Sequence, residues 1–534
     1  MRLLVKGARV VDGSGAAPFE ADVLVEGDRI AAVGPGLEAS SGARVVEASG
    51  LVVCPGFIDM HGHNDLRVLD DPAVAPKLMQ GITTEVLGQD GISMAPLPPE
   101  RAPEWRQYLA EFDGTSESVD WSYGDTAGYL AMLERAGPAA NCCYVVPNGN
   151  LRLAAAGLEG RPLSAAESER MTAILRRELE AGAFGLSAGL IYAPSSYASA
   201  EELAALCSAV REYDGVFMVH QRSEADAILE SADEILEIGR RSGVHVHFSH
   251  LKVCGKKNAG KLGPLLAKFD EAEAAGLELS FDQYPYAFGS TSMGVLLPPW
   301  AHDGGIEALL ARLARGEERR RMRADIEAGI PGWDNFVDFA GFDGIFLTSA
   351  PGGRNERFIG KSLVEMAAAR GGDPFEALFD IVLEERNQAG IVDFYGAEDM
   401  VSRIMARPEM TACTDGILDE RPHPRVYGAF PRILGKYVRE EGLLSLEAAV
   451  HRMTGRSAAA LRLADRGLVR PGRFADLVLL DPDRVRDRAT FEEPTLPPEG
   501  IELVLVNGEI EVESGALTGR RAGRVLRRTG ARRP

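Results

Sequence analysis

Two histidines, His61 and His63, stand where an apolar run ends, within residues 54–65. The run has the character of a buried strand. Residues two apart on a strand point to the same side, so both imidazoles can reach one cation. Imidazole nitrogen is a good ligand for zinc and similar divalent ions. The pair therefore predicts a metal site, although a polar strand end without a metal is the alternative for these two residues alone.

The same arrangement returns later in the chain. His220 and His250 each end a β-rich run, and Asp415 follows another. In a (β/α) barrel the chemistry lies at the C-terminal ends of the strands. Four of the nine histidines, together with Asp415, thus predict a metal site whose ligands come from several strands.

Two neighbouring cations need an anion between them. A carboxylated lysine often supplies it, but no lysine occurs between residues 78 and 251. The available anion is Asp90, just past an apolar run, and we expect it to bridge the two cations. Asp90 is followed by glycine, so a plain Asp-Gly turn is the alternative.

The segments that must position these residues alternate helices with buried strands. Ser164 and Ser199 each precede a glutamate by three residues, which predicts two helix starts. Further helices are expected at about 223–241 and 258–275, and strands near 183–187, 216–220, 244–250 and 277–284. This alternation predicts a parallel sheet, and its length favours a closed TIM-like (β/α)8 barrel over an open sheet.

The two ends of the chain share a different texture, with short β-rich runs and turns in residues 1–56 and again near 475–480 and 503–508. We expect them to form one small β-sandwich domain. The barrel is then expected at 57–423, with an insertion over its mouth at about 290–410. Residues 424–534 would supply the last barrel helices, the return to the β domain and a solvated basic tail that includes Arg520, Arg532 and Arg533.

Composition limits the partners. The net charge of −21 over 534 residues argues against nucleic acid, and neither a membrane-spanning run nor a signal peptide is visible. Six cysteines without a CxxC pair indicate reduced thiols and a cytoplasmic protein. We expect a small-molecule partner that carries a carboxylate, and the oligomeric state is left open.

Taken together, the motifs resemble those of the amidohydrolase superfamily, and within it the N-acyl-D-amino-acid deacylase (D-aminoacylase) group. The likeness covers nearly the whole chain. The matching segments are PGFIDMHGHND at 55–65, the run from Gly81 to Pro96, His220-Gln221-Arg222-Ser223-Glu224, Ser249-His250-Leu251-Lys252, Thr414-Asp415-Gly416 and HPRVYGAFPR at 423–432.

The resemblance implies a TIM-like barrel with a β domain, one or two zinc ions, and hydrolysis of N-acyl amino acids, D-configured as in the group. Two positions depart from the pattern. Asp90 stands where the family usually has a cysteine, so another divalent metal can replace zinc. Asn148 stands where the family often has a histidine.

We expect two metal sites and one catalytic carboxylate. The tighter site would use Asp90, His220 and His250. The weaker site would use His61, His63, Asp90 and Asp415. Asp415 would act as general base and then general acid beside a metal-bound hydroxide.

The remaining roles concern the substrate. Lys252, Tyr284 and Ser290 are expected to hold its carboxylate, and Tyr192 to donate to the oxyanion, with plain aromatic packing as the alternative for Tyr192. Arg222 is predicted as a further substrate contact, or as a structural partner of Glu224 or of a nearby strand end. His245 and His247 are expected in the core, away from the metal.

Two other functions stay open from the sequence. One is another amidohydrolase reaction, such as dipeptide or cyclic amide hydrolysis. The other is a catalytically silent barrel used for binding, which the histidines and Asp415 argue against.

Overall fold

The computed structural model describes residues 2–39 and 41–528. Its centre is a ring of eight parallel strands, in which β9 and β10 are consecutive parts of one strand. A hydrogen bond from the residue after β6 to the end of β18 closes the ring, with Met60 N donating to Ala412 O at 3.2 Å. The strands are β6 (Phe57–Asp59), β8 (Ile82–Leu87), β9 (Asn141–Tyr144) with β10 (Val146–Pro147), β11 (Gly185–Gly189), β12 (Val216–His220), β13 (His245–Phe248), β14 (Leu279–Gln283) and β18 (Met410–Ala412).

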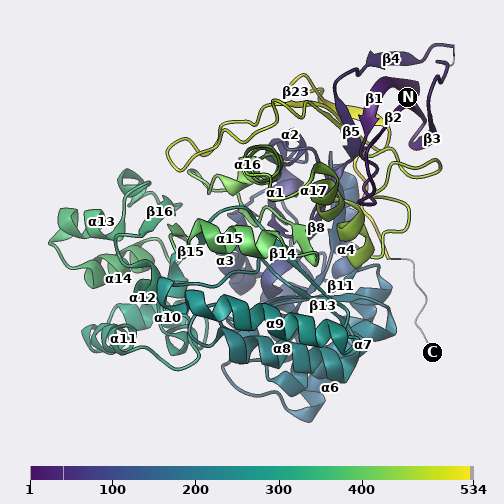
Figure 1. Ribbon diagram of the computed structural model, residues 1–534. Coiled ribbons are helices and arrows are strands. Elements are labelled where there is room, and N and C mark those ends of the chain that lie inside the picture. The colour runs from purple at the N-terminus through teal and green to yellow at the C-terminus, as the bar shows by residue number, and fades with distance from the viewer. Residues whose placement is uncertain (1, 40, 529–534) are drawn as a thin grey trace.

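Helices connect successive strands and pack outside the ring (Figure 1). They include α2 (Ala75–Met79), α4 (Thr126–Ala136), α6 (Ala165–Glu180), α7 (Ala200–Glu212), α8 (Ile228–Ser242), α9 (Leu262–Ala274), α15 (Glu398–Met405) and α17 (Leu446–Met453). Ser164 and Ser199 cap α6 and α7 as the sequence predicts, each accepting a hydrogen bond from the glutamate amide three residues on. The predicted (β/α)8 barrel is confirmed.

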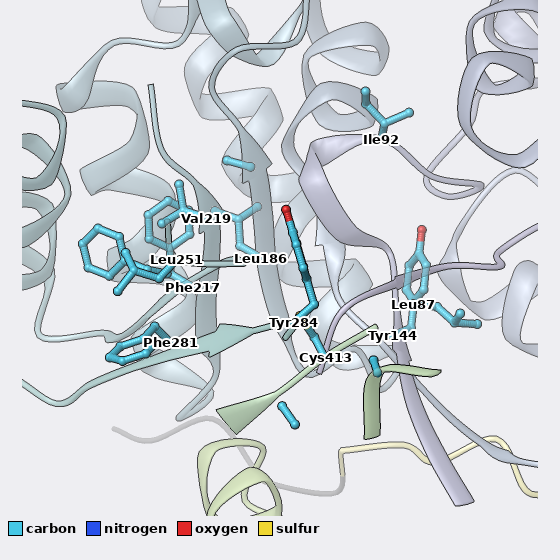
Figure 2. Packing of buried hydrophobic residues seen from close by; sticks show 14 of the residues in the cluster. Leu87, Ile92, Tyr144, Leu186, Phe217, Val219, Leu251, Phe281, Tyr284 and Cys413 are labelled. Atoms are coloured by element: carbon cyan, nitrogen blue, oxygen red, sulfur yellow. The ribbon is translucent and has the colours of Figure 1, made fainter. Parts of the chain in front are cut away.

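The strands are apolar because both of their faces are covered. A large cluster of buried residues fills the space between strands and helices. Figure 2 shows part of it, with Phe217, Val219 and Phe281 gathered on one side of the view. Burial of such side chains contributes roughly 1.5–3 kcal/mol each. This packing holds the strand ends, and therefore the residues that follow them, in fixed positions.

Both chain ends build one nine-stranded sheet, as predicted. The strand β5 pairs antiparallel with β20, which joins the two halves. Residues of both halves share a separate apolar core. The strands are β1 (Arg2–Val10), β2 (Phe19–Glu26), β3 (Arg29–Gly34), β4 (Arg44–Glu47), β5 (Val52–Pro55), β20 (Leu477–Leu480), β21 (Ile501–Val506), β22 (Glu509–Glu513) and β23 (Ala516–Leu517).

The insertion lies between β14 and β18 and forms a lobe beside the barrel (left in Figure 1). It has its own three-stranded antiparallel sheet and its own apolar core. Its elements are β15 (Gly289–Ser292), β16 (Ile345–Ser349), β17 (Gly390–Asp393), α10 (Ile306–Leu313), α11 (Gly316–Ala328), α12 (Phe336–Ala340), α13 (Leu363–Arg370) and α14 (Pro374–Glu384).

The basic tail is solvated, as predicted, at Arg520 and Arg524, whose side chains are 57% and 46% exposed. The segment is nonetheless held in place. Cys142 on β9 donates to the carbonyl of Arg524 and accepts from Leu526, so this segment runs along the barrel. Arg524 and Arg527 also pair with Asp28 and Glu134. Backbone pairing and opposite charges thus fix the segment, while Arg532 and Arg533 lie outside the described residues.

All six cysteines are buried and free. Burial raises the pKa of several of their thiols, for example that of Cys143 to about 12. Among the described residues, no helix has the length and apolar character needed to cross a membrane.

Candidate metal centre and substrate cavity

The six predicted metal ligands come together at the C-terminal mouth of the barrel, and all are buried. Each follows or ends a strand. They are His61 after β6, His63 in β7 (Gly62–His63), Asp90 after β8, His220 at the end of β12, His250 after β13 and Asp415 after β18. The short strand β7 pairs with β19 (Gly416–Ile417), which brings the HxH segment beside Asp415.

Asp90 lies at the centre of the group, because its carboxylate faces four imidazoles. One oxygen lies 3.5 Å from Nε2 of His61. The other lies 3.7 Å from Nε2 of His63, 3.7 Å from Nδ1 of His220 and 3.6 Å from Nε2 of His250. This is the placement expected of an anion shared between two cation sites.

Asp415 closes the group on the side of the HxH segment. Its Oδ1 lies 3.6 Å from Nε2 of His61 and 3.3 Å from Nε2 of His63. Its Oδ2 lies 2.7 Å from Nη1 of Arg425, which is at the start of α16 (Arg425–Arg432) and only 1% exposed as a side chain. One oxygen of Asp415 thus faces the metal site and the other is held by a buried cation.

Charge keeps both carboxylates ionised despite their burial. Burial would raise the pKa of Asp90, but His61, His220 and His250 hold that pKa well below its usual value. Burial acts the same way on Asp415, and Arg425, His250 and His63 lower its pKa well below the usual value. For His61, burial would lower the pKa, but Asp90 and Asp415 raise it.

The donor set fits a divalent cation. Both ring nitrogens of His61 and of His220, and Oδ1 of Asp90, are buried without a hydrogen-bond partner, although buried polar groups nearly always have one. Zinc bonds to nitrogen and oxygen of about 2.1 Å place tetrahedral neighbours about 3.4 Å apart. The separations of 3.3–3.7 Å described above agree with that spacing.

Three of these residues have a left-handed backbone. The φ angles are 53° at Asp90, 33° at His250 and 48° at Asp415. Residues other than glycine rarely adopt this region, and such strain gathers at functional sites. The surrounding packing therefore fixes the side chains in directions that a regular strand would not give.

A cavity with about 490 Å³ of atom-free space opens from the metal ligands. Lys252, Tyr284 and Ser290 line it, as predicted for groups that hold a carboxylate, and Arg425 lines it with them. The centre of the Tyr284 ring lies 5.9 Å from Lys252 Nζ and 4.5 Å from the Arg425 guanidinium. Both cations also contact metal ligands, since Lys252 Nζ lies 2.7 Å from Nδ1 of His250 and Arg425 Nη1 lies 2.7 Å from Oδ2 of Asp415. The cavity thus places two cations directly beside the metal ligands.

Tyr192 also lines the cavity and packs edge-on against His220, with ring centres 5.4 Å apart. Its hydroxyl lies 3.0 Å from Oγ1 of Thr291 in β15. Burial raises the pKa of Tyr192 well above its usual value, so the phenol keeps its proton and can donate it in a hydrogen bond.

Arg222 is not among the residues that line the cavity, and its predicted contact with substrate stays a prediction. Its guanidinium pairs with Glu234 at 3.0 Å and donates to the carbonyls of Ser196 and Ala198. The carboxylate and the two carbonyls thus accept the hydrogen bonds that the planar guanidinium donates. Of the structural alternatives, the described residues contain no pair with Glu224, and Arg222 instead holds the loop after β11 through those two carbonyls.

Two further histidines, and the asparagine that stands where the family often has a histidine, lie outside the group of metal ligands. His245 and His247 are buried and share the hydroxyl of Ser280, and His247 Nε2 also lies 2.8 Å from Asp282. Asn148 begins α5 (Asn148–Ala156) and is not among the cavity-lining residues.

Three charged residues that line the cavity had no predicted role: Asp334, Asp393 and Arg425. Glu224, which also lines it, was named only as an alternative partner of Arg222. Glu224 and Arg425 stood inside motifs already singled out, and Glu224 is four residues after His220, so their positions carried a signal. Asp393 lies in the insertion, where no motif marked it.

The family model described as the amidohydrolase family matches residues 44–320 and 341–512. The chain therefore belongs to the amidohydrolase family. Within that family it groups with the D-aminoacylases, as its motifs predict.

Three relatives carry this grouping. N-acyl-D-glutamate deacylase of Alcaligenes xylosoxydans xylosoxydans is 38% identical over 98% of this chain and 96% of its own. D-aminoacylase of the same organism is 36% identical over 99% of this chain and 98% of its own. The crystal structure of N-acyl-D-glutamate deacylase from Bordetella bronchiseptica, complexed with zinc and a phosphonate mimic of the tetrahedral intermediate, matches with a TM-score of 0.82 at 36% identity, covering 98% of this chain and 99% of that one.

Proposed function

We propose that this protein hydrolyses the amide bond of N-acyl-D-amino acids to a carboxylate and a free amino acid. The observation that carries the proposal is a cavity that joins a group of metal ligands to two cations. Four imidazoles surround Asp90, with Asp415 beside them. Lys252 and Arg425 line the same cavity. The relatives named as D-aminoacylase and N-acyl-D-glutamate deacylase supply the reaction and the hand of the substrate.

The proposed cofactor is zinc, at one or two sites. Asp90, His220 and His250 would hold the tighter ion, and His61, His63, Asp90 and Asp415 the weaker. Nitrogen and carboxylate ligands suit zinc but also manganese, cobalt or iron. A bound divalent ion would supply Lewis acidity, which makes water a better nucleophile and the amide carbonyl a better electrophile.

The chain's own groups would carry the protons and the charge. Asp415 is ionised and has one oxygen turned to the metal ligands, so it can take a proton from the attacking water and return it to the leaving nitrogen. Tyr192 keeps its proton and can donate to the carbonyl oxygen as negative charge develops there.

Lys252 and Arg425 would orient the substrate. Both line the cavity together with Tyr284. A carboxylate bound there directs the rest of an amino acid towards the metal ligands. Fixed anchoring of this kind is also what lets an active site distinguish the two hands of a substrate.

The test is a screen of N-acetyl and N-succinyl amino acids of both hands, in which release of the free amine is measured. The protein should be assayed after its metal content has been measured and restored with Zn²⁺. We expect amine release from D-substrates and little from their L-counterparts. Metal-loaded protein that releases amine from no N-acyl amino acid would refute the proposal.

A further inference from the structure

Lys77 is a buried cation that the proposed reaction does not use. It lies in α2 and is only 1% exposed, although lysine is almost never fully buried unless it is paired. Its ammonium lies 2.5 Å from Oδ2 of Asp59 and 3.5 Å from Oε2 of Glu85. Burial would lower the pKa of Lys77, but the two carboxylates raise it above its usual value, so the ammonium stays charged. These three residues form the Lys77 cluster.

The Lys77 cluster holds the HxH segment at both of its ends. Asp59 ends β6, and its Oδ1 accepts a hydrogen bond from the amide of the first histidine at 3.3 Å. Glu85 accepts from Nδ2 of Asn64, the residue after the second histidine, at 2.8 Å. Between these ends, a Cβ added to Gly62 would lie 2.6 Å from Nζ of Lys77. The ammonium therefore packs directly against the middle of the segment.

The same cluster fixes the turn that carries Asp415. The amide of Thr414 donates to Oδ1 of Asp59 at 2.8 Å, and the Thr414 hydroxyl donates to Oδ2 at 2.6 Å. That hydroxyl accepts from Nζ of Lys77 at 2.9 Å and from the amide of Gly416 at 3.2 Å. The φ of Asp415 is 48°, and such a conformation persists only where the surroundings determine it. The bonds on either side of Asp415 supply that constraint.

The Lys77 cluster thus joins the two parts of one proposed metal site. Residues 59 and 414 are 355 positions apart in the chain, yet one carboxylate accepts from an amide in each part. The weaker ion would take ligands from both parts, so its site depends on their separation. The tighter site is built differently, because His220 ends β12 and His250 follows β13, and neither takes part in these contacts.

We propose that Lys77 and Asp59 are positioning residues that set the separation between the HxH segment and Asp415. Asp59 binds the backbone of both parts, and Lys77 neutralises and orients its carboxylate. The pair thereby governs the affinity of the weaker metal site and the placement of the base. Neither residue is among those that line the cavity. The inference rests on the metal centre of the proposed function.

The first test measures Zn²⁺ binding to the wild type and to Lys77→Met, by competition with chelators of graded affinity. The dissociation constant of the weaker site should rise about 10- to 100-fold, as it does when an outer partner of metal ligands is lost. That of the tighter site should stay as in the wild type. In the metal-loaded variant, kcat should fall by a larger factor than KM rises, because Asp415 moves while Lys252 does not.

Arg466→Met is the matched control. The side chain of Arg466 is 2% exposed and pairs with Asp476 next to β20, away from the cavity. Loss of this buried pair should lower the thermal stability, as loss of Lys77 does, but both Zn²⁺ affinities should remain those of the wild type. The control thus separates a general loss of stability from a loss of positioning.

A second variant covers the case in which Lys77→Met does not fold, since it leaves two buried carboxylates without a cation. Thr414→Val removes the hydroxyl that links Lys77 to Asp59 and changes no charge. The dissociation constant of the weaker site should rise about 3- to 10-fold, the effect of one hydrogen bond, and that of the tighter site should not change.

Two results would overturn the inference. One is a folded variant in which both sites lose affinity equally or neither loses any. The other is wild-type protein that binds a single Zn²⁺ ion at saturation, because the weaker site would then not exist. In both cases the proposed hydrolysis, which needs only one ion, would still be decided by its own substrate screen.

Discussion

Arg425 should set the pH at which Asp415 becomes competent as a base. The guanidinium Nη1 lies 2.7 Å from Oδ2 of Asp415, and both side chains are almost fully buried. Arg425→Gln removes the positive charge and keeps a polar amide, but the shorter side chain gives up the contact of Nη2 with the carbonyl of Ser290 at 3.1 Å.

The size of the effect follows from Coulomb's law. Two unit charges about 4 Å apart interact by about 4 kcal/mol at an effective dielectric constant of about 20. At about 1.4 kcal/mol per pKa unit, that is up to about 3 units, and carboxylates beside arginine show shifts of about 1–3 units. The pKa of Asp415 in the variant should therefore rise by about 1–3 units.

The direction of this change in the pKa of Asp415 determines which limb of the pH profile moves. Asp415 must be ionised to accept a proton, and a higher pKa means that it protonates at a higher pH. The acid limb of kcat/KM, which reports the free enzyme, should therefore move up by about 1–3 pH units, while the alkaline limb stays. The assay is amine release from an N-acyl-D-amino acid across pH, with metal content measured at each point.

Arg432→Gln is the control, since Arg432 ends the same helix but pairs with Asp487 away from the metal ligands. Its acid limb should match that of the wild type. If Arg425 served only to bind the substrate carboxylate, its loss would raise KM by the same factor at every pH. A fully metal-loaded Arg425→Gln with an unmoved acid limb would refute the argument.

Three further predictions concern single side chains. Asp415→Asn should fold and keep its metal but lose about 10²–10⁴ in kcat, and near-normal turnover in metal-loaded protein would exclude its role as base. Lys252→Met should raise KM far more than it lowers kcat, and an unchanged KM would exclude Lys252 as the anchor of the substrate carboxylate. The control is Lys257→Met, which should change neither constant, because Lys257 pairs with Asp226 and Asp338 and does not line the cavity. Burial raises the pKa of Asp393 to about 7, against the pull of Lys252 and Arg425, so Asp393 gains negative charge in the cavity as pH rises through about 7 and KM for a carboxylate substrate should rise with it. In Asp393→Asn the rise in KM should disappear, and parallel KM profiles in the two proteins would count against this assignment. The Tm of the variant should exceed that of the wild type at pH 8 but not at pH 4, because the folded-state pKa of Asp393 lies above the unfolded value of about 3.9 and its ionisation therefore destabilises the wild type at high pH.

The fold was predictable because its signals are local and repeated. Helix caps such as Ser164, and strands of uniformly apolar residues, recur along the chain at the spacing of strand–helix units. The histidines could be placed because the end of an apolar run is visible in the sequence. The basic segment before residue 528 could not be placed, since its partners, such as Cys142 and Asp28, lie several hundred residues away.

The same limit explains what the sequence left open at the site. Arg222 and Arg425 each stand in a motif, and only tertiary structure shows which one enters the cavity. Arg222 finds Glu234 twelve residues on and is held outside. Arg425 meets Asp415 through the helix that follows β19, and its charge then governs the carboxylate. A residue's type gives its chemistry, but the direction of its side chain depends on elements that a linear pattern does not relate.

Asp90 shows that two interpretations of one residue need not compete. The sequence allowed either an Asp-Gly turn or a bridging ligand. The structure has the turn, with φ of 53° at Asp90 and 71° at Gly91, and the same carboxylate faces four imidazoles. Asp415, also followed by glycine, has a φ of 48° and faces His61 and His63. A left-handed residue just past a strand turns its side chain back across the barrel mouth. The turn is therefore the means by which each carboxylate reaches the metal ligands, and an Asp-Gly pair after a barrel strand is evidence for a ligand position as well as for a turn.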